Sequence, residues 1–443
     1  MKVPRECGAY LCGQLTGKTV QICLNVSLMR NNLNRAFKQV KRNGGASGID
    51  GMTIDKLLEY LQEHKESFLG SLRNGMYRPL PVKRVEIPKP DGGVRLLGVP
   101  AMIDRMIQQA ISQVLTPIFE EEFSGTSYGF RPGRSAHQAI RKAQEYCNEG
   151  YRRVVDLDLS KYFDTLNHEL LMNMWREKIH DNRVLNLIKR YLKSGVMVNG
   201  VVIATEQGSP QGGNLSPLLS NIYLTSFDRE LERRGHKFVR CADDVNIYVK
   251  SRRAAERVLA GSRKFLETKL KLKVNETRSK AGSPLKLKFL GFALRVTVKG
   301  QAGIRIHEKS IDRFKNKIRV LTRRNQGRSL EYMLQKLQRS TTGWLNYYAI
   351  ADMKNFIQQS NGWIKRKIRC YIWKQWKRIK TKFENLQRLD APRSKAWEWA
   401  NTRKGYWHIA NSWIVNKTLT DKRIIQMGYD DISVRYNELH SSY

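Results

Sequence analysis

Hydrophobic residues recur at helical spacing through the first quarter of the chain. Residues 28–75 predict helix, because apolar side chains stand at positions i, i+3, i+4 and i+7, as in Leu33, Ala36, Phe37 and Val40. A second amphipathic helix is predicted over residues 103–115, and the pair Thr116 and Pro117 is expected to end it. Residues 77–100 between them are rich in Pro and Gly and predict turns and extended chain.

Short apolar runs and longer periodic segments alternate through the middle of the chain. Strands are predicted over residues 153–159 and 289–298, and a hairpin over residues 238–250. Helices are predicted over residues 168–192, 215–234 and 254–270, and mostly helices follow from residue 310. The pattern therefore favours an α+β body followed by a helical tail.

The charge of the chain changes the range of partners to consider. Its 80 Lys and Arg residues against 40 Asp and Glu residues give a formal net charge of +40. A globule of that charge repels itself unless it meets a polyanion, so nucleic acid is the favoured partner. An anionic membrane surface is the weaker alternative, because the charge is not confined to one amphipathic helix. No apolar run is long enough to span a bilayer, and the N-terminal residues do not resemble a signal peptide.

The last third of the chain is the most basic part and is rich in tryptophan. Eight of the nine tryptophans lie after residue 340. Residues 361–380 hold eight basic and no acidic residues between aromatic ones, a mixture suited to phosphate contact and base stacking. The candidate contacts there are Lys365, Arg366, Lys367 and Arg369. Two other interpretations remain for this segment. The tryptophans would instead anchor the cores of small helical domains, and the basic residues would form a solvated helix face that contacts no nucleic acid. The six scattered cysteines predict free thiols in a reducing compartment.

Two acidic segments are candidates for chemistry. Alternation along residues 153–159 places Asp156 and Asp158 on one face of a strand. The adjacent Asp243 and Asp244 interrupt two apolar strand halves, and the tip of a hairpin would let both face one ion. Carboxylates on neighbouring strands are able to hold two Mg²⁺ ions for phosphoryl transfer. For a single surface Asp the ordinary interpretation is solvation.

Seven blocks in this order resemble the group II intron-encoded reverse transcriptase/maturase family. They span residues 84–95, 127–134, 158–164, 208–217, 242–244, 273–280 and 289–292, and residues 343–348 resemble the maturase thumb signature. The resemblance covers residues 30–430. It implies a right-hand polymerase, with residues 1–30 as a tail and 31–300 as fingers and palm with an N-terminal extension. Residues 301–380 would form the thumb or maturase domain X, and 381–443 a small basic DNA-binding-like domain.

The resemblance assigns roles residue by residue. It makes Asp158, Asp243 and Asp244 the catalytic carboxylates that hold two Mg²⁺ ions, with the Leu159 carbonyl completing a metal site. It makes Phe163 the steric gate against the ribose 2′-hydroxyl. The remaining nucleotide-binding positions that it implies are Lys89, Arg95, Gln211 and Lys280.

One position departs from the family pattern. The family usually has Tyr before Ala-Asp-Asp, where this chain has Cys241. That Tyr packs near the primer end, and the smaller Cys cannot stack there. Because the carboxylates are intact, we expect activity, with nucleotide fit and primer affinity affected. A catalytic thiol is disfavoured, because no His lies nearby in sequence.

The implied function is an RNA-directed DNA polymerase that binds group II intron RNA, assists its splicing and copies it during retrohoming. Its partners would be the intron RNA, an RNA template with a DNA primer, target DNA and dNTPs, with no membrane and with a homodimer as an option. We expect a cytoplasmic protein associated with ribonucleoprotein or nucleoid. The HNH endonuclease of some relatives and an RNase H signature are both missing, so second-strand nicking would come from elsewhere. Two alternatives remain: a splicing maturase with an idle or weak polymerase site, and a domesticated reverse transcriptase in DNA repair or phage defence.

Overall fold

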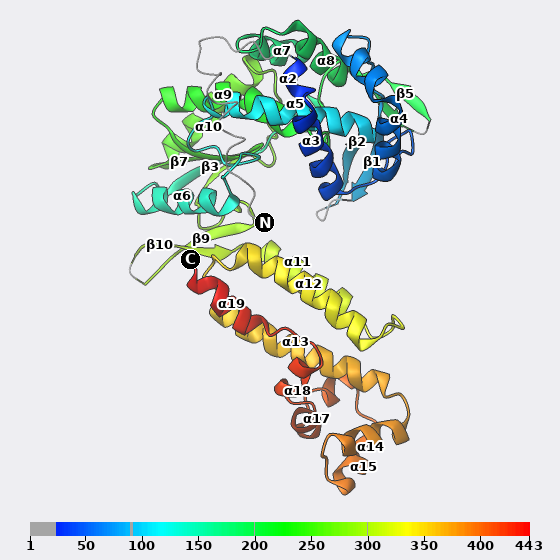
Figure 1. Cartoon of the computed structure of the whole chain (residues 1–443). Helices are drawn as coiled ribbons and strands as arrows, with labels where there is room; N and C mark the ends of the chain where they lie inside the picture. Colours follow the sequence, from blue (N-terminus) through cyan, green and yellow to red (C-terminus); the bar gives the residue numbers. More distant parts are fainter. Residues whose placement is uncertain (1–23, 89–91, 199, 299) are drawn as a thin grey trace. The chain divides into compact units, whose positions relative to one another are not determined.

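The computed structural model describes residues 24–88, 92–198, 200–298 and 300–443. The chain divides into two compact units, an N-terminal unit that ends at Ser283 and a C-terminal unit from Pro284 to Tyr443. Figure 1 labels most of their helices and strands. None of the helices in the described ranges combines the length and hydrophobicity needed to cross a bilayer.

Four helices open the N-terminal unit: α2 (Leu24–Ser27), α3 (Arg30–Asn43), α4 (Ile54–Arg73) and α5 (Met102–Glu120). The helix predicted over residues 28–75 is thus two helices, with Gly44 and Gly45 at positive φ between them. The prediction that helix 103–115 ends at Pro117 was wrong, since α5 continues to Glu120. Packing holds its last turn, because the Phe119 ring lies 5.0 Å from the Trp175 ring.

A four-stranded sheet has the order β2-β1-β4-β5, with two of its strands lying between α4 and α5 in the chain and two coming after α5. The strands are β1 (Val82–Pro88), β2 (Val94–Val99), β4 (Val196–Val198) and β5 (Val201–Ile203). β1 pairs with β2 in antiparallel register, and β4 joins β1 in parallel register. Gly98 of β2 donates its backbone N–H to the carbonyl of Gln211, which lies in a loop of the candidate site.

A second sheet is antiparallel throughout, in the order β6-β7-β3-β8. Its strands are β3 (Arg153–Leu157), β6 (Lys237–Cys241), β7 (Asp244–Val249) and β8 (Lys280–Gly282). The predicted strand at 153–159 and hairpin at 238–250 are confirmed. The helices of this region are α6 (Ala136–Asn148), α7 (His168–Arg176), α8 (Asn182–Lys193), α9 (Ser216–Arg233) and α10 (Arg252–Thr268), with a 3₁₀ turn η2 (Tyr162–Asp164).

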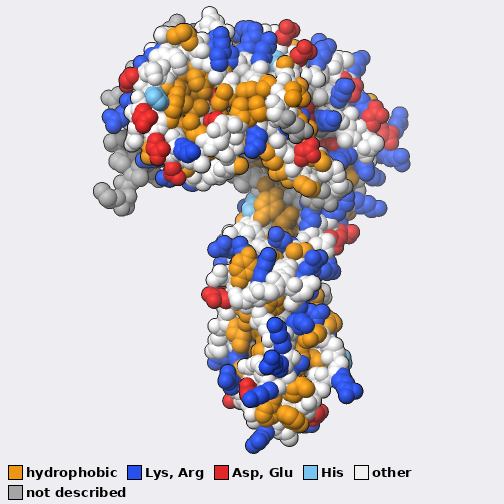
Figure 2. All heavy atoms as spheres, turned by 90° about the vertical axis from the view of Figure 1, so that its right-hand side faces the viewer, with side chains coloured by type: hydrophobic (Ala, Val, Ile, Leu, Met, Phe, Trp, Pro, Cys, Tyr) orange, Lys and Arg blue, Asp and Glu red, His pale blue; other side chains and the backbone are white. Residues whose placement is uncertain are grey.

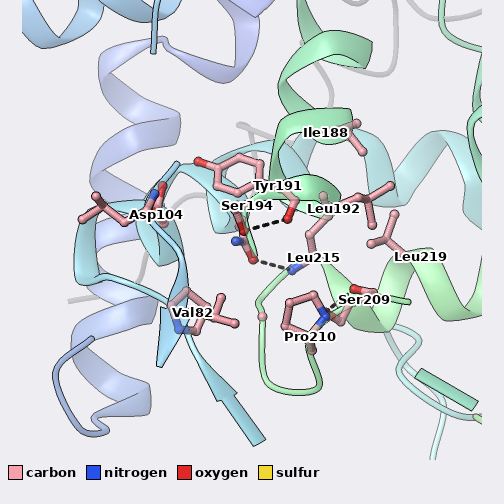
Figure 3. A pocket seen from close by; sticks show the side chains of 15 residues that line it. Val82, Asp104, Ile188, Tyr191, Leu192, Ser194, Ser209, Pro210, Leu215 and Leu219 are labelled. Atoms are coloured by element: carbon pink, nitrogen blue, oxygen red, sulfur yellow. Dashed lines mark hydrogen bonds between the residues drawn. The ribbon is translucent and has the colours of Figure 1, made fainter. Parts of the chain in front are cut away.

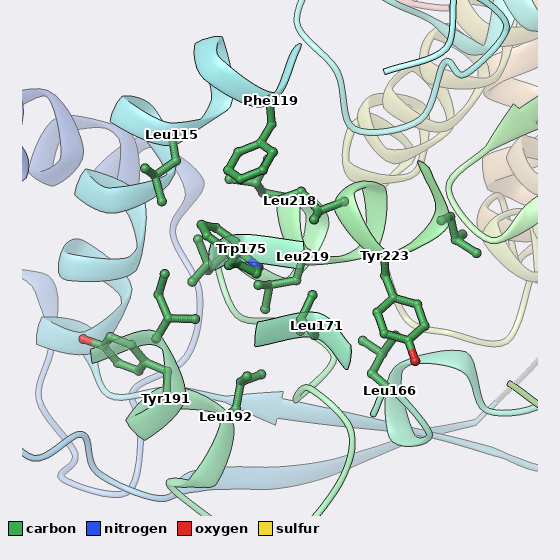
Figure 4. Packing of buried hydrophobic residues seen from close by; sticks show 14 of the residues in the cluster. Leu115, Phe119, Leu166, Leu171, Trp175, Tyr191, Leu192, Leu218, Leu219 and Tyr223 are labelled. Atoms are coloured by element: carbon green, nitrogen blue, oxygen red, sulfur yellow. The ribbon is translucent and has the colours of Figure 1, made fainter. Parts of the chain in front are cut away.

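One hydrophobic core fills the N-terminal unit beneath the second sheet. Apolar side chains from α5, α7, α8 and α9 meet around the fully buried Trp175 (Figure 4). Val155 and Leu157 of β3 face this core, so the alternate residues Asp156 and Asp158 face away from it. The core thereby fixes which side of the sheet presents its carboxylates.

The C-terminal unit is a two-stranded sheet followed by helices. It contains β9 (Phe292–Val296), β10 (Ala302–Ile306), α11 (Glu308–Leu321), α12 (Leu330–Tyr348), α13 (Lys354–Gln375), α14 (Ile379–Arg388), α15 (Arg393–Ala400), α16 (Tyr406–Ile409), α17 (Trp413–Thr418), α18 (Asp421–Gln426) and α19 (Ile432–Ser441). Aromatic stacking joins α11 to α12, with the Phe314 and Trp344 rings 4.3 Å apart. Because α19 packs on both α12 and α13, the end of the chain belongs to the same unit. The predicted division at residue 380 stays a prediction.

Candidate active site

Three predicted carboxylates lie at one end of the β6-β7-β3-β8 sheet. Asp243 and Ala242 form the two-residue turn between β6 and β7, and Asp244 begins β7. Leu157 pairs with Val245, so the continuing antiparallel register sets Asp158 beside Asp244. The folded chain thus brings together side chains that are more than eighty residues apart in sequence.

A fourth carboxylate, Asp156, lies on the same face of the sheet. Burial, together with the negative charges of Asp244 and Asp158, raises its pKa to about 7, against the opposing charge of Lys280. Asn246 faces Asp156 across the strand pair, and in the amide orientation that satisfies both of its polar atoms the nitrogen donates to Asp156 Oδ1 at 2.9 Å. This end of the sheet therefore concentrates negative charge in a strongly basic protein.

Carboxylate oxygens are the ligand type that Mg²⁺ prefers, and crowded negative charge is what a divalent cation relieves. The donor set of Asp158, Asp243 and Asp244 fits such an ion in this respect. Within the described ranges, however, no three His, Cys, Asp or Glu side chains already gather closely enough to enclose one. The backbone of Asp158 is held by Asn275, whose N–H donates to its carbonyl at 2.8 Å. The metal-binding role of the neighbouring Leu159 carbonyl stays a prediction.

The loop that holds Gln211 is attached to two other parts of the site through its backbone. Ser209 N–H donates to Phe163 O at 2.6 Å, which joins the loop to the turn after Asp158. Gly98 N–H of β2 donates to Gln211 O at 2.8 Å. Close approach explains the glycines, since a Cβ on Gly212, at φ +126°, would lie 2.6 Å from Gly98 O. The predicted gate and nucleotide contact are therefore neighbours in the fold.

The other predicted nucleotide-binding residues have different placements. Arg95 is exposed on β2, three residues before Gly98. Lys280 is exposed on β8 and lies directly across from Asp156. Phe163 is half-buried and packs against the hydrophobic core, with Tyr162 at 5.2 Å between ring centroids. Lys89 lies outside the described residues.

A cavity of about 20 Å³, enough for one water molecule, lies under this loop (Figure 3). Ser209, Pro210 and Leu215 of the loop face Tyr191 of α8, and Asp104 of α5 lies on the other side. Asp104 is 1% exposed and accepts from the Tyr77 hydroxyl at 2.8 Å. Burial raises the pKa of Asp104 to about 6, against the lowering effect of the Tyr77 hydrogen bond. Two neighbouring residues of α5 support the loop directly, since Gln109 Oε1 accepts from Asn214 Nδ2 at 3.0 Å and Gln108 Oε1 accepts from Leu215 N–H at 3.4 Å.

The match to known families agrees with this geometry. Residues 87–294 match the reverse transcriptase (RNA-dependent DNA polymerase) family, and residues 311–389 match the group II intron maturase-specific domain. The chain belongs to the group II intron reverse transcriptase/maturase family. The seven ordered sequence blocks had indicated the same family.

Individual relatives match parts of the chain. Protein YkfC of Escherichia coli is 44% identical over 191 residues, which are 42% of this chain and 50% of that protein. The group II intron-encoded protein LtrA of Lactococcus lactis is 36% identical over 206 residues, 46% of this chain and 34% of LtrA. Nuclear intron maturase 2 of Arabidopsis thaliana is 29% identical over 31% of this chain and 24% of that protein. The chain thus spans half or less of the length of these curated relatives. A solved Cas6-RT-Cas1–Cas2 complex matches 55% of this chain and 42% of the solved chain at 26% identity, with a TM-score of 0.36.

Cys241, where the family usually has Tyr, lies at the end of β6 in register with Asp244. Burial, together with the negative charge of Asp244, raises the pKa of its thiol to about 11. A protonated thiol is a poor nucleophile. Cys147, Cys241 and Cys370 are free thiols, as predicted, and the other three cysteines lie outside the described residues.

The four basic residues predicted to contact nucleic acid divide into two pairs on α13. Lys365 and Arg369 are buried, at 7% and 8% exposure. Lys365 Nζ lies 2.8 Å from Asp421 and 2.8 Å from Asp431, and Arg369 Nη2 donates to Asp421 at 2.7 Å. These two charges are therefore compensated inside the protein, and the geometry gives them a structural role rather than the expected phosphate contacts.

The other pair is more accessible. Arg366 and Lys367 are half-buried, and the Arg366 guanidinium lies 4.0 Å from the centre of the Trp407 ring. Lys367 Nζ lies 5.0 Å from the centre of the Trp363 ring. Lys and Arg side chains outnumber acidic ones on the face of the C-terminal unit that Figure 2 shows, with hydrophobic side chains between them. For this pair, nucleic-acid contact stays a prediction.

Sequence reasoning overlooked the residues that support the carboxylate turn. Arg240 stands inside the apolar run of β6 and is 0% exposed, as is its partner Asp228 of α9. Gly129, in the block 127–134 that carries the family resemblance, lies against the turn itself. A charged residue within a buried strand was the one available signal, since such a residue requires a buried partner.

Proposed function

We propose that this protein is an RNA-directed DNA polymerase that uses two Mg²⁺ ions held by Asp158, Asp243 and Asp244. The observation that supports the proposal best is the meeting of these carboxylates at one sheet end, in a domain that matches reverse transcriptases. Bound there, Mg²⁺ would neutralise charge that develops during phosphoryl transfer. The primer 3′-hydroxyl would lose its proton to solvent, and its oxygen would bond to the α-phosphorus of a dNTP while the bond from that phosphorus to the leaving pyrophosphate breaks.

The chain's own residues would position the nucleotide. Phe163 would exclude a ribose 2′-hydroxyl, and the nearby Gln211 would contact the incoming nucleotide. Arg95, Lys89 and Lys280 would bind the triphosphate, a task suited to Arg and Lys side chains. Support for this arrangement comes from the hydrogen bonds that join the Gln211 loop to Phe163 and to β2.

The maturase part of the proposal concerns the C-terminal unit. We infer that it binds group II intron RNA, assists splicing and supports retrohoming into target DNA. Support comes from the maturase-specific match over residues 311–389 and from the basic side chains, with hydrophobic ones between them, on the surface of this unit. Loss of splicing assistance on the flanking intron RNA after Arg366→Gln and Lys367→Gln together would agree with this role.

Primer extension on poly(rA) with oligo(dT) tests the polymerase. Asp243→Asn should lower the extension rate by about 100-fold or more, because it removes a ligand charge at the reacting centre. RNA affinity should stay unchanged, because the basic surfaces are untouched. Asp312→Asn, which removes the same charge from an exposed position on α11, is the matched control. Absence of extension by the wild-type protein would refute the proposal in favour of a maturase with an idle polymerase site.

A further inference from the structure

A buried ion pair lies directly beneath the turn that presents Asp243. The side chains of Arg240 in β6 and Asp228 in α9 are both 0% exposed. Arg240 Nε and Nη2 donate to the two Asp228 oxygens at 2.8 and 2.6 Å, a bidentate pairing. This pairing fixes the plane of the guanidinium and leaves Nη1 pointing elsewhere.

The remaining nitrogen reaches the turn itself. Arg240 Nη1 donates to the carbonyl oxygen of Ala242 at 3.1 Å, immediately before Asp243 in the chain. It also donates to Asn221 Oδ1 of α9 at 2.9 Å. Asn221 Nδ2 in turn donates to Gly129 O at 2.9 Å. One connected network therefore joins α9, the turn and the segment that ends at Gly129.

Backbone contacts press the same segment against the turn. Tyr128 N–H donates to Arg240 O at 2.8 Å, and Arg240 N–H donates to Thr126 O at 3.0 Å. A Cβ on Gly129 would lie 2.1 Å from Ala242 N, closer than any side chain tolerates. The turn is thus held between Gly129 on one side and α9 on the other.

Two features of the turn need such support. Ala242 has φ +59°, a conformation that is costly for a residue with a side chain. Several carboxylates also repel one another at this sheet end. A buried ion pair is by itself weak support for stability, because well-packed hydrophobic residues often replace one at no cost. The hydrogen bond to the Ala242 carbonyl is a function that hydrophobic residues cannot replace.

We propose that Arg240, held by Asp228 and Asn221, is a positioning residue that fixes the turn so that Asp243 and Asp244 bind divalent cations productively. Gly129 serves the same turn by its lack of a side chain. The inference rests on the proposed polymerase function but concerns residues outside the carboxylate set.

The double substitution Asp228→Leu and Arg240→Met tests the proposal in the full chain. It removes both charges together and keeps the site filled, so the melting temperature should change little. Affinity for Mn²⁺, measured by electron paramagnetic resonance as a probe of the carboxylate site, should fall about 10-fold to 100-fold. Amide hydrogen exchange in residues 238–249 should accelerate, and the Mg²⁺ concentration for half-maximal primer extension should rise by a similar factor.

Arg190→Met is the matched control. Arg190 on α8 is another partly buried arginine that donates to backbone carbonyls, those of Gly75 and Tyr77, away from the turn. Its loss should affect melting alone and leave Mn²⁺ affinity unchanged. If the double variant does not fold, Asn221→Leu replaces it, because that change keeps the ion pair and removes the two hydrogen bonds by which Asn221 links Arg240 Nη1 to Gly129 O.

The outcomes separate the two proposals. Normal Mn²⁺ affinity and normal exchange in a folded double or Asn221 variant would overturn the positioning role while leaving the polymerase proposal intact. Failure of the wild-type protein to extend a primer would overturn the polymerase proposal. Arg240→Lys should restore little of the Mn²⁺ affinity, because an ammonium cannot make the bidentate contact to Asp228 and the contact to the Ala242 carbonyl together.

Discussion

Lys365 offers a sharp test of how the C-terminal unit uses its positive charge. Its ammonium lies between Asp421 and Asp431, which belong to α18 and to the cap of α19. Lys365→Met keeps most of the side-chain length and removes the charge. We expect a marked loss of stability with almost no loss of RNA affinity, because the charge contacts protein rather than solvent.

The expected magnitude follows from the burial of each partner. Removing one member of a fully buried ion pair costs about 3–5 kcal/mol, whereas an exposed pair contributes about 0–1 kcal/mol. The side chains of Lys365 and Asp431 are 9% and 12% exposed, but that of Asp421 is 56% exposed and keeps Arg369. Asp431 also keeps its hydrogen bond from Asn361 at 2.8 Å. We therefore expect about 2–3 kcal/mol, or a melting shift of about 5–10 °C for this unit.

The stability lost in Lys365→Met should become smaller as pH falls. Burial alone would raise the pKa of Asp431, but hydrogen bonds from Lys365 and Asn361 lower it below its ordinary value. Hydrogen bonds from Lys365 and Arg369 likewise lower the pKa of Asp421, against the effect of burial. A carboxylate with a lowered folded pKa contributes stability above its unfolded pKa of about 3.9 and loses it as pH falls through the folded value. The difference between wild type and Lys365→Met should therefore be full at pH 7 and shrink below about pH 4.

The comparison pair is Arg366→Gln with Lys367→Gln. If both contact phosphates, the slope of log K against log salt should flatten by about 1.4–1.8 units, with melting little changed. Thermal melting and RNA titration at several salt concentrations separate the two variants. A flattened slope with unchanged melting for Lys365→Met would refute the assignment of that charge to the interior.

Two further changes test the nucleotide site. Phe163→Val should raise the kcat/KM for ribonucleotides relative to that for deoxynucleotides, because a smaller side chain leaves room for the 2′-hydroxyl. An unchanged ratio of the two kcat/KM values would make Phe163 an ordinary core residue. Gly212→Ala should lower kcat/KM for dNTPs by about 5-fold to 150-fold, since its Cβ would meet Gly98 O at 2.6 Å and backbone strain costs about 1–3 kcal/mol. Gly235→Ala, also at positive φ but in open space, is the control, and equal losses in both variants would contradict the close-contact argument.

The sequence predicted the parts of the site that depend on local pattern. The hairpin with Asp243 at its turn and the strand before Asp158 both follow from short apolar runs interrupted by acidic residues, and the structure contains both. Alternation also placed Asp156 on the same face as Asp158, although no role was inferred for it. These features depend on a period of two along a strand, which is visible in any single sequence.

Features that depend on long-range contact were not predictable in this way. The burial of Lys365 and Arg369 depends on Asp421 and Asp431, which lie more than fifty residues away in the chain. A run of basic residues in one helix is typical both of an exposed surface and of a buried ion-pair cluster, and only the partners decide between them. The continuation of α5 through Pro117 likewise depends on packing against Trp175 from another helix.

The supporting contacts explain why whole blocks of sequence, rather than single residues, identify this site. Gln211 and Asp243 both lie on turns, yet each turn is fixed by the close approach of a backbone segment from elsewhere: β2 at Gly98 for the first and the segment at Gly129 for the second. Neither contact leaves room for a side chain, so each glycine and its neighbours must fit closely against the turn that presents Gln211 or Asp243. The resemblance assigns no role to any residue of block 127–134, but this block holds the turn that presents two carboxylates. Substitutions there should therefore damage catalysis as much as changes to residues that contact the nucleotide.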